Sequence, residues 1–345
     1  LKDVAERAGV AVNTASTILN RRPNSWASKE TEARVFQAAK DLGYRPSKTA
    51  RALQSGRYDA IGILIQDLGN PFFPTIADEL EVAAEEHELG LIIENCRSSL
   101  IREKRLFGAL EDLEIDGIVL CLSDIELYRE ELAEKFERSS MPIVVLGNGV
   151  PSQPFPVDAV LSDFTQGLTE AVEALCQLGH ERFAFLSALA EGTSHGSRPQ
   201  LFQELLAARG VPASAIDILR CGHSIESAWE AFSAFLRHDH VKRPTALVAM
   251  NDLSALGAMR AARDAGLRIP EDISIVGVDD VPLSAYFPVS LSTIRQRFRK
   301  ITRAASDLLL SRIDPGENPP PDTPRQTVFP THFVQRESVG PPPKG

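Results

Sequence analysis

Residues 3–20 constrain this chain more than any other stretch, because their pattern predicts two short helices joined by a tight turn. Gly9 stands at the end of the first helix, where a residue that tolerates positive φ is needed. Asn13 or Thr14 can cap the second helix, which runs to about Asn20. A short exposed helix held by a partner helix fits the major groove of DNA, although a plain helical hairpin shows the same pattern. The side chains predicted to face outward are Val12, Asn13, Ser16 and Thr17.

A third helix and a basic segment follow this pair. Ser28 caps an amphipathic helix over 28–41, and Gly43 and Pro46 then stop it. Residues 1–57 contain 11 Lys or Arg and 5 Asp or Glu, which gives a net charge of +6. Since the whole chain carries −10, the remainder carries −16. This asymmetry indicates a DNA-facing head attached to an acidic body.

The head resembles that of the lactose-repressor family of bacterial transcription regulators. The resemblance rests on the runs D-V-A-x-x-A-G-V, T-x-S-x-x-L-N, L-G-Y-R-P and A-R-x-L-x-x-G. Thr17 departs from the family, in which most members have a base-reading arginine there, so we expect a different operator sequence. Segment 47–56 has too narrow an apolar stripe to fold alone, and we hypothesise that two copies become helical only when paired on DNA, with Leu53 wedged between base steps. The residues predicted to contact DNA are Lys2, Arg7, Val12, Asn13, Ser16, Thr17, Arg21, Tyr44, Ser47, Ala50 and Leu53.

The rest of the chain alternates short apolar runs with amphipathic helices. Runs that are apolar throughout and joined by helices are typical of parallel strands buried on both faces. Two doubly wound lobes are therefore predicted, and such folds bind ligands at the carboxyl ends of their strands. Helices are predicted over 73–87, 101–112 and 125–138, and strands over 60–66, 89–96, 117–122, 142–147, 159–163, 182–188, 216–221, 246–252 and 273–280.

The predicted fold class is α/β, with a small helical head and a two-lobed body like that of periplasmic binding proteins. We expect a helix-turn-helix headpiece over 1–45, a hinge over 46–57, and an effector-binding and dimerisation domain over 58–345. Within that domain, the pattern of strands restarts with the apolar run at 159–163. The first lobe is therefore expected to cover about 58–158 and 286–312, and the second about 159–285 and 313–337.

The body extends the resemblance to nearly the whole chain. The matching blocks include N-D-L-S-A-L-G at 251–257 and I-P-E-D-I-S-I-V-G at 269–277. The resemblance implies that Arg198, Asn251 and Asp279 contact a small-molecule effector. A guanidinium, an amide and a carboxylate in one cleft suit vicinal hydroxyls, because each hydroxyl both donates and accepts a hydrogen bond. The residues predicted to bind the effector are Gln66, Asn70, Phe72, Phe73, Arg198, His223, Asn251, Asp279 and Phe298.

Each of these predictions has a structural alternative. Asn251 and Asp279 can cap helices instead of binding a ligand. Phe72 or Phe73 on one lobe and Phe298 on the other can cover the apolar face of a sugar ring or a base, or all three can belong to the core.

Two further positions bear on the identity of the effector. His223 matches a position where some sugar-responsive members have an aromatic residue, although a surface loop is an equal interpretation. Gly147-Asn148 replaces an Asp-Arg pair often seen in the family, which removes a possible hydroxyl-binding carboxylate.

Motifs of enzymes are missing from the sequence. There is no G-x-G-x-x-G after the first strand, no P-loop, no G-x-S-x-G and no H-E-x-x-H. We expect no cofactor and no metal, although His238-Asp239-His240 is superficially metal-like. No apolar run approaches the ~20 residues that a membrane helix requires.

We therefore expect a cytoplasmic, homodimeric, ligand-responsive regulator of transcription, a repressor rather than an enzyme. Its predicted partners are operator DNA and a small-molecule effector, with a carbohydrate favoured over a purine. A solute-binding protein of the same fold would lack the basic head, whereas an activator with this fold stays open as an alternative.

Overall fold

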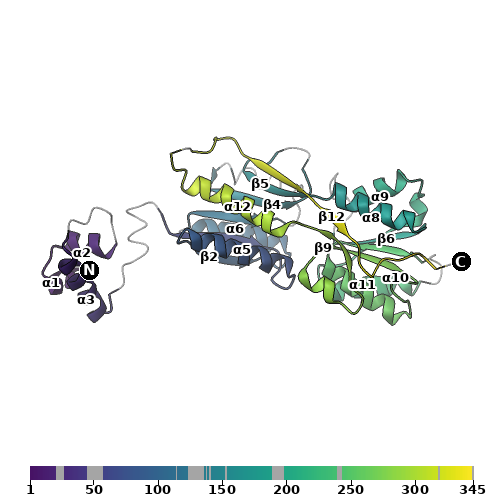
Figure 1. Cartoon of the computed structure of the whole chain (residues 1–345), viewed down its shortest axis with the longest axis horizontal. Coiled ribbons are helices and arrows are strands. Elements are labelled where there is room, and N and C mark those ends of the chain that lie inside the picture. The colour runs from purple at the N-terminus through teal and green to yellow at the C-terminus, as the bar shows by residue number, and fades with distance from the viewer. Residues whose placement is uncertain are drawn as a thin grey trace. The chain divides into compact units, whose positions relative to one another are not determined.

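The computed structural model describes residues 1–20, 27–44, 57–113, 115–122, 136, 138–139, 141–151, 154–188, 198–238, 243–317 and 319–343 (Figure 1). The chain divides into two compact units. The first contains Leu1–Ala60 and Asp112–Asp116, and the second contains Ile61–Glu111 and Gly117–Gly345. Almost all of the predicted hinge over 46–57, and most of the helix predicted over 125–138, lie outside the described residues.

The first unit contains three helices, α1 (Lys2–Ala8), α2 (Val12–Leu19) and α3 (Lys29–Asp41). As the sequence predicts, Gly9 ends α1 with a φ of 66°, and the Ser28 side chain caps α3. The predicted capping of α2 by Asn13 or Thr14 is wrong, because the helix already begins at Val12 and its N-cap, Ala11, has no side-chain hydrogen bond. Small apolar side chains at helical spacing form the core, namely Val4, Ala5, Ala8, Ala15, Ile18, Val35, Ala38 and Ala39.

A six-stranded sheet forms the first lobe of the second unit, in the order β11-β5-β4-β3-β1-β2. The pairings of β1 with β3, β3 with β4, β4 with β5 and β5 with β11 are all parallel. Alternate residues of β1, Ile61 and Ile63, pack in one core with Ile76 of α5 and Leu309 of α12. The elements are β1 (Ala60–Ile65), α5 (Phe72–Glu86), β2 (Gly90–Asn95), α6 (Leu100–Asp112), β3 (Gly117–Cys121), β4 (Ile143–Asn148), β5 (Asp158–Asp163), α12 (Phe298–Ile313) and β11 (Gln326–Pro330).

A second six-stranded sheet, in the order β12-β10-β9-β8-β6-β7, forms the second lobe. Its strands are parallel except β12, which pairs antiparallel with β10. Phe183 and Phe185 of β6 pack on the side of α8 and α9, whereas Ala184 and Leu186 pack on the side of α10 and α11 (Figure 1). The elements are α8 (Thr165–Gln177), β6 (Phe183–Ser187), α9 (Arg198–Ala207), η1 (Ala213–Ala215), β7 (Ile216–Arg220), α10 (Ile225–Leu236), β8 (Ala246–Ala249), α11 (Asp252–Asp264), β9 (Ser274–Asp279), η2 (Pro282–Tyr286), β10 (Ser292–Arg295) and β12 (His332–Val334).

The two-lobed α/β architecture is confirmed, but three strands lie in the lobe opposite to the one expected. The run at 159–163 was expected to open the second lobe, yet β5 pairs with β4 in the first sheet. Likewise β10 belongs to the second sheet and β11 to the first, so the expected divisions at 286–312 and 313–337 are wrong for these two strands. They are correct for α12, which packs in the first lobe, and for β12, which joins the second sheet. The cause is that an apolar run specifies a buried strand without specifying its neighbour. In the described residues, the chain therefore passes between the lobes after β5, after β10 and after β11.

Candidate functional site

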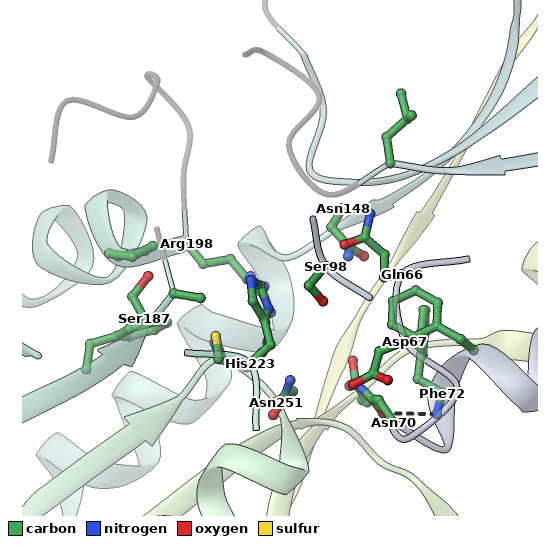
Figure 2. A pocket seen from close by; sticks show the side chains of 17 residues that line it. Gln66, Asp67, Asn70, Phe72, Ser98, Asn148, Ser187, Arg198, His223 and Asn251 are labelled. Carbon is green, nitrogen blue, oxygen red and sulfur yellow. Dashed lines mark hydrogen bonds between the residues drawn. The ribbon is translucent and has the colours of Figure 1, made fainter. Parts of the chain in front are cut away.

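A cavity of about 770 Å³, which includes space open to solvent, lies where strands of both sheets reach their carboxyl ends. Side chains from the two lobes face one another across it (Figure 2). The first lobe contributes Gln66, Asp67, Asn70, Phe72, Phe73, Ser98, Leu122 and Asn148, and the second contributes Phe185, Ser187, Ala188, Arg198, Pro199, His223, Met250, Asn251 and Asp279. Eight of the nine residues predicted to bind an effector are thus brought together.

Asp279 is the most constrained polar residue of this cleft. It ends β9, only 5% of its surface is exposed, and its φ of 109° lies in a region that side-chain-bearing residues rarely adopt. Oδ1 accepts a hydrogen bond of 2.8 Å from Nε2 of Gln296, and Asn70 donates a second hydrogen bond to the carboxylate. Burial raises the pKa of Asp279 to about 7, while Arg198 and the two amide donors oppose this shift. Unusual backbone geometry combined with a perturbed carboxyl group is typical of functional sites.

Arg198 begins α9 and places a guanidinium in the same cleft. Its Nη1 donates a 2.6 Å hydrogen bond to the carbonyl oxygen of Met250, and Cζ lies 4.9 Å from the centre of the Phe164 ring. Burial lowers the pKa of Arg198, and the nearby Asp279 opposes the shift. Because a guanidinium has five N–H donors, one bond to Met250 fixes its direction and leaves donors for a ligand.

Asn251 is both a helix cap and a residue of the cleft. Its Oδ1 accepts a 2.8 Å hydrogen bond from the backbone nitrogen of Ser254, so the capping interpretation is confirmed for this residue. The residue also lines the cavity. With Oδ1 committed to α11, Nδ2 is the atom that can serve a ligand, and only as a donor.

Asp252, which was not among the predicted site residues, holds the neighbouring turn in place. It is 1% exposed, and its Oδ2 accepts a 2.8 Å hydrogen bond from the backbone nitrogen of Val281. Its Oδ1 accepts a 2.6 Å bond from the Thr293 hydroxyl. Burial raises the pKa of Asp252 well above its ordinary value, and the charge of Asp279 adds to the shift. Its position directly after Asn251 in the N-D block was the available signal.

The aromatic residues divide between the cleft and the core. Phe72 and Phe73 line the cavity, with their ring centres 5.0 Å apart in an edge-to-face arrangement. Phe298 packs edge-on against Phe72, also at 5.0 Å, within the core of the first lobe. The expectation that Phe298 faces these rings from the other lobe is therefore wrong, because α12 returns to the first lobe after β10. A smaller apolar cavity shares both rings and is walled by Ile76, Cys121, Leu146, Val160 and Ile301.

Other predicted and unpredicted residues complete the lining. His223, in the loop between β7 and α10, is exposed and also lines the cavity, so the loop interpretation and the cleft position are both correct. Asp67, Ser98, Asn148 and Ser187 line the cavity but were not among the predicted residues. Asp67 and Ser98 lie in loops just after β1 and β2, whereas Asn148 and Ser187 are the last residues of β4 and β6, so proximity to a strand end was the available signal.

The outward face of α2 carries the residues predicted to read DNA. Val12 and Asn13 are exposed, whereas Ser16 and Thr17 are half-buried. The Thr17 hydroxyl donates a 2.9 Å hydrogen bond to the backbone oxygen of Asn13, and Asn20 donates a 3.3 Å bond to the Ser16 hydroxyl oxygen. These local bonds hold Ser16 and Thr17 close to the helix.

The remaining predicted DNA contacts differ in their surroundings. Lys2 is exposed, but Arg7 forms a 3.3 Å ion pair with Asp41, so a phosphate must compete with a carboxylate for it. Tyr44 is half-buried and packs against the core of the first unit. The predicted contacts that lie outside the described residues are Arg21, Ser47, Ala50 and Leu53.

Within the described ranges, no group of three His, Cys, Asp or Glu side chains is placed to hold a metal ion. The metal-like tripeptide over 238–240 lies mostly outside these ranges. No helix of the described chain is long and apolar enough to cross a bilayer.

Two family models match the chain. Residues 1–47 match the model described as bacterial regulatory proteins, lacI family, and residues 172–339 match the periplasmic binding protein-like domain. The HTH-type transcriptional repressor PurR of Aliivibrio fischeri strain MJ11 is 31% identical over 313 residues, which cover 91% of each chain. The ribose operon repressor of Halalkalibacterium halodurans is 32% identical over 341 residues, covering 98% of this chain and 96% of the relative.

Solved structures share the whole architecture. The lac repressor dimer bound to operator and the anti-inducer ONPF matches with a TM-score of 0.80 and 26% identity, covering 98% of each chain. The complex of the transcriptional regulator CelR with cellobiose matches with a TM-score of 0.68 and 27% identity over the same share of both chains.

Proposed function

Because this chain belongs to the lacI family of bacterial regulatory proteins, we propose that its cleft binds a sugar as the effector of a DNA-binding repressor. The chain is a ligand-responsive, DNA-binding repressor and not an enzyme. It binds operator DNA and a small molecule, and it works as a dimer, as the lac repressor does.

The convergence of Arg198, Asn251 and Asp279 on one cavity supports a polyhydroxylated ligand. The carboxylate of Asp279 accepts hydrogen bonds, whereas the guanidinium of Arg198 and Nδ2 of Asn251 donate them. Vicinal hydroxyls can satisfy all three groups at once, because each hydroxyl donates one bond and accepts others. Phe72 and Phe73 add apolar rings on the opposite lobe, against which the C–H face of a sugar can pack.

The second part of the proposed function, binding to operator DNA, is assigned to residues of the headpiece. Val12, Asn13, Ser16 and Thr17 on α2 are proposed to contact base edges, and Lys2 to contact phosphate. We also propose that segment 47–56 links this head to the effector domain and folds on DNA, as its composition predicts. Effector binding would then change the pairing of two such segments and so change operator affinity.

A thermal-shift screen of the full chain tests the effector class. D-ribose, cellobiose and lactose form the sugar arm, and guanine and hypoxanthine form the purine arm. A ligand at about 100 times its Kd stabilises the folded protein by about 2.7 kcal/mol, which gives a clear rise in melting temperature. Stabilisation by a purine and by no sugar would contradict the proposed class, although the cleft would keep its role.

Arg198→Ala tests whether the screen reports this cleft. We expect the variant to lose stabilisation by the sugar, since its donors reach hydroxyls that would otherwise be unpaired. Arg209→Ala is the matched control, because Arg209 is another partly buried arginine of the second lobe that pairs with Glu173 at 2.6 Å and does not line the cavity. Unchanged sugar stabilisation in the Arg198 variant would place the sugar elsewhere.

A further inference from the structure

Gln296 lies at a crossing between the two lobes, on the segment that joins β10 to α12, and is only 3% exposed. Its side-chain amide bridges groups that belong to different sheets. Nε2 donates a 2.8 Å hydrogen bond to Oδ1 of Asp279, which ends β9 in the second sheet. Oε1 accepts a 2.6 Å hydrogen bond from the hydroxyl of Ser162, in β5 of the first sheet.

The chemistry of the two partners fixes which way this amide points. An ionised carboxylate can only accept hydrogen bonds, so the NH2 end of Gln296 must face Asp279. The carbonyl end then needs a donor, and the Ser162 hydroxyl supplies one. A reversed amide would bring an oxygen against the carboxylate in a buried place, which is strongly unfavourable. The Asp279 carboxylate therefore sets the orientation of Gln296, and the Ser162 hydroxyl satisfies the carbonyl end that this orientation leaves over. Gln296 in turn supplies one of the donors that surround Asp279.

Other groups that face Asp279 come from both lobes. Arg198 on α9 is the cationic group, and Asp252 at the start of α11 is the second carboxyl group. Both carboxylate oxygens of Asp252 already accept hydrogen bonds, one from the backbone nitrogen of Val281 and one from the Thr293 hydroxyl. Asn70, in the loop after β1, accepts a 3.0 Å bond from the backbone nitrogen of Phe72 through Oδ1, so its NH2 end serves Asp279. Two neutral amides therefore donate hydrogen bonds to the Asp279 carboxylate: Asn70 from the first lobe, and Gln296 from the segment that crosses between the lobes.

We propose that Gln296 is a positioning residue that couples the crossing between the lobes to effector binding, by holding the Asp279 carboxylate ready to accept hydroxyl groups. This inference rests on the proposed function, in which Asp279 binds a sugar. The sequence between β10 and α12 places Gln296 where any rotation of one lobe against the other must move it relative to Ser162 or Asp279. A change in the angle between the lobes therefore changes the affinity of the cleft, and by reciprocity a bound sugar favours one angle.

An NMR titration of the full chain without ligand tests the link between Gln296 and Asp279. The ¹³C carboxyl signal of Asp279 is assigned by its absence in Asp279→Asn, and its midpoint is then followed with pH. Gln296→Met keeps similar volume but removes the donor to the charged form, so we expect the midpoint to rise by about one pH unit. Gln296→Asn is too short to bridge both partners and should give the same shift if the Met variant does not fold.

Ser162 variants test whether the hydrogen bond to the carbonyl end of Gln296 matters, as distinct from the volume that the Ser162 side chain fills. Ser162→Ala should move the Asp279 midpoint upward by a smaller amount, and Ser162→Thr, which keeps the hydroxyl, should restore it. Ser306→Ala is the control, because Ser306 on α12 is buried and its hydroxyl donates a 2.9 Å bond to the Thr302 carbonyl oxygen of its own helix. An unchanged midpoint in folded Gln296→Met and Gln296→Asn would overturn the inference.

Sugar binding gives the second readout, measured by calorimetry with whichever of D-ribose, cellobiose or lactose stabilises the protein. We expect Gln296→Met to bind about fivefold more weakly at pH 7, because a rise of the Asp279 pKa from about 7 by about one unit lowers the ionised fraction at pH 7 from about a half to about a tenth. Most of this loss should be recovered at higher pH, where Asp279 is ionised in both proteins. A loss that is the same at every pH would mean a purely structural role and would refute the proposal. If no sugar binds but the midpoint moves, the proposed effector class fails while the coupling of Gln296 to Asp279 stands.

Discussion

Replacing Asp279 by asparagine should stabilise the ligand-free protein above neutral pH. The carboxyl group is buried, and its pKa is raised from 3.8 to about 7. A carboxyl group whose folded pKa is raised contributes stability below its unfolded pKa and loses it as pH rises through the folded pKa. The wild-type protein should thus lose stability from about pH 4 to about pH 7 at this site.

The size of the effect follows from the shift. One pKa unit corresponds to about 1.36 kcal/mol, so a shift of about three units costs about 4 kcal/mol once Asp279 is ionised. Asparagine carries no charge and avoids this cost, but its NH2 group faces one of the two amide donors, Gln296 or Asn70. That mismatch costs about 1 kcal/mol, which leaves a net gain of about 3 kcal/mol at pH 8 and little difference at pH 4.

Urea unfolding at a series of pH values measures this difference. Trp229 is a suitable probe, because it lies on α10 in the same lobe as Asp279 and its Nε1 donates a 2.9 Å bond to Asp264. Asp78→Asn is the control, since Asp78 is exposed on α5 and does not line the cavity. If Asp279→Asn were less stable than the wild type at pH 8, the carboxylate would be a structural link between the lobes rather than a group kept for a ligand.

Two predictions concern DNA. Asn13→Ala should relax sequence preference, whereas Lys2→Ala should weaken binding to every sequence and reduce the salt slope by about 1, as measured by fluorescence anisotropy on specific and random duplexes; unchanged affinities in both variants would mean that α2 is not the reading helix. Leu53→Ala should sharply reduce operator affinity without changing sugar affinity in the absence of DNA, and amide exchange should show 47–56 protected only with operator. Equal protection with and without operator would refute folding of this segment on DNA.

Local features of the chain were largely predictable from its sequence. The helical spacing of Val4, Ala5 and Ala8 and the glycine that follows them identify α1 and its end, because these signals act within one or two turns. The short apolar runs likewise identify the buried strands. Asn251 and Asp279 were predicted for the cleft because polar residues that follow or end buried strands of a doubly wound sheet gather at one edge.

Contacts between distant segments were decided by the tertiary structure alone. An apolar run indicates that a strand is buried on both faces, but it does not indicate which sheet the strand joins. The sheets of β5, β10 and β11 were therefore not predictable from their own residues. The bridge from Ser162 through Gln296 to Asp279 joins residues 134 and 17 positions apart, and it exists only because the chain crosses between the lobes there. Periodicity determines the burial of each element, whereas pairing across long separations sets the surroundings of each polar group, and therefore the charge that Asp279 carries.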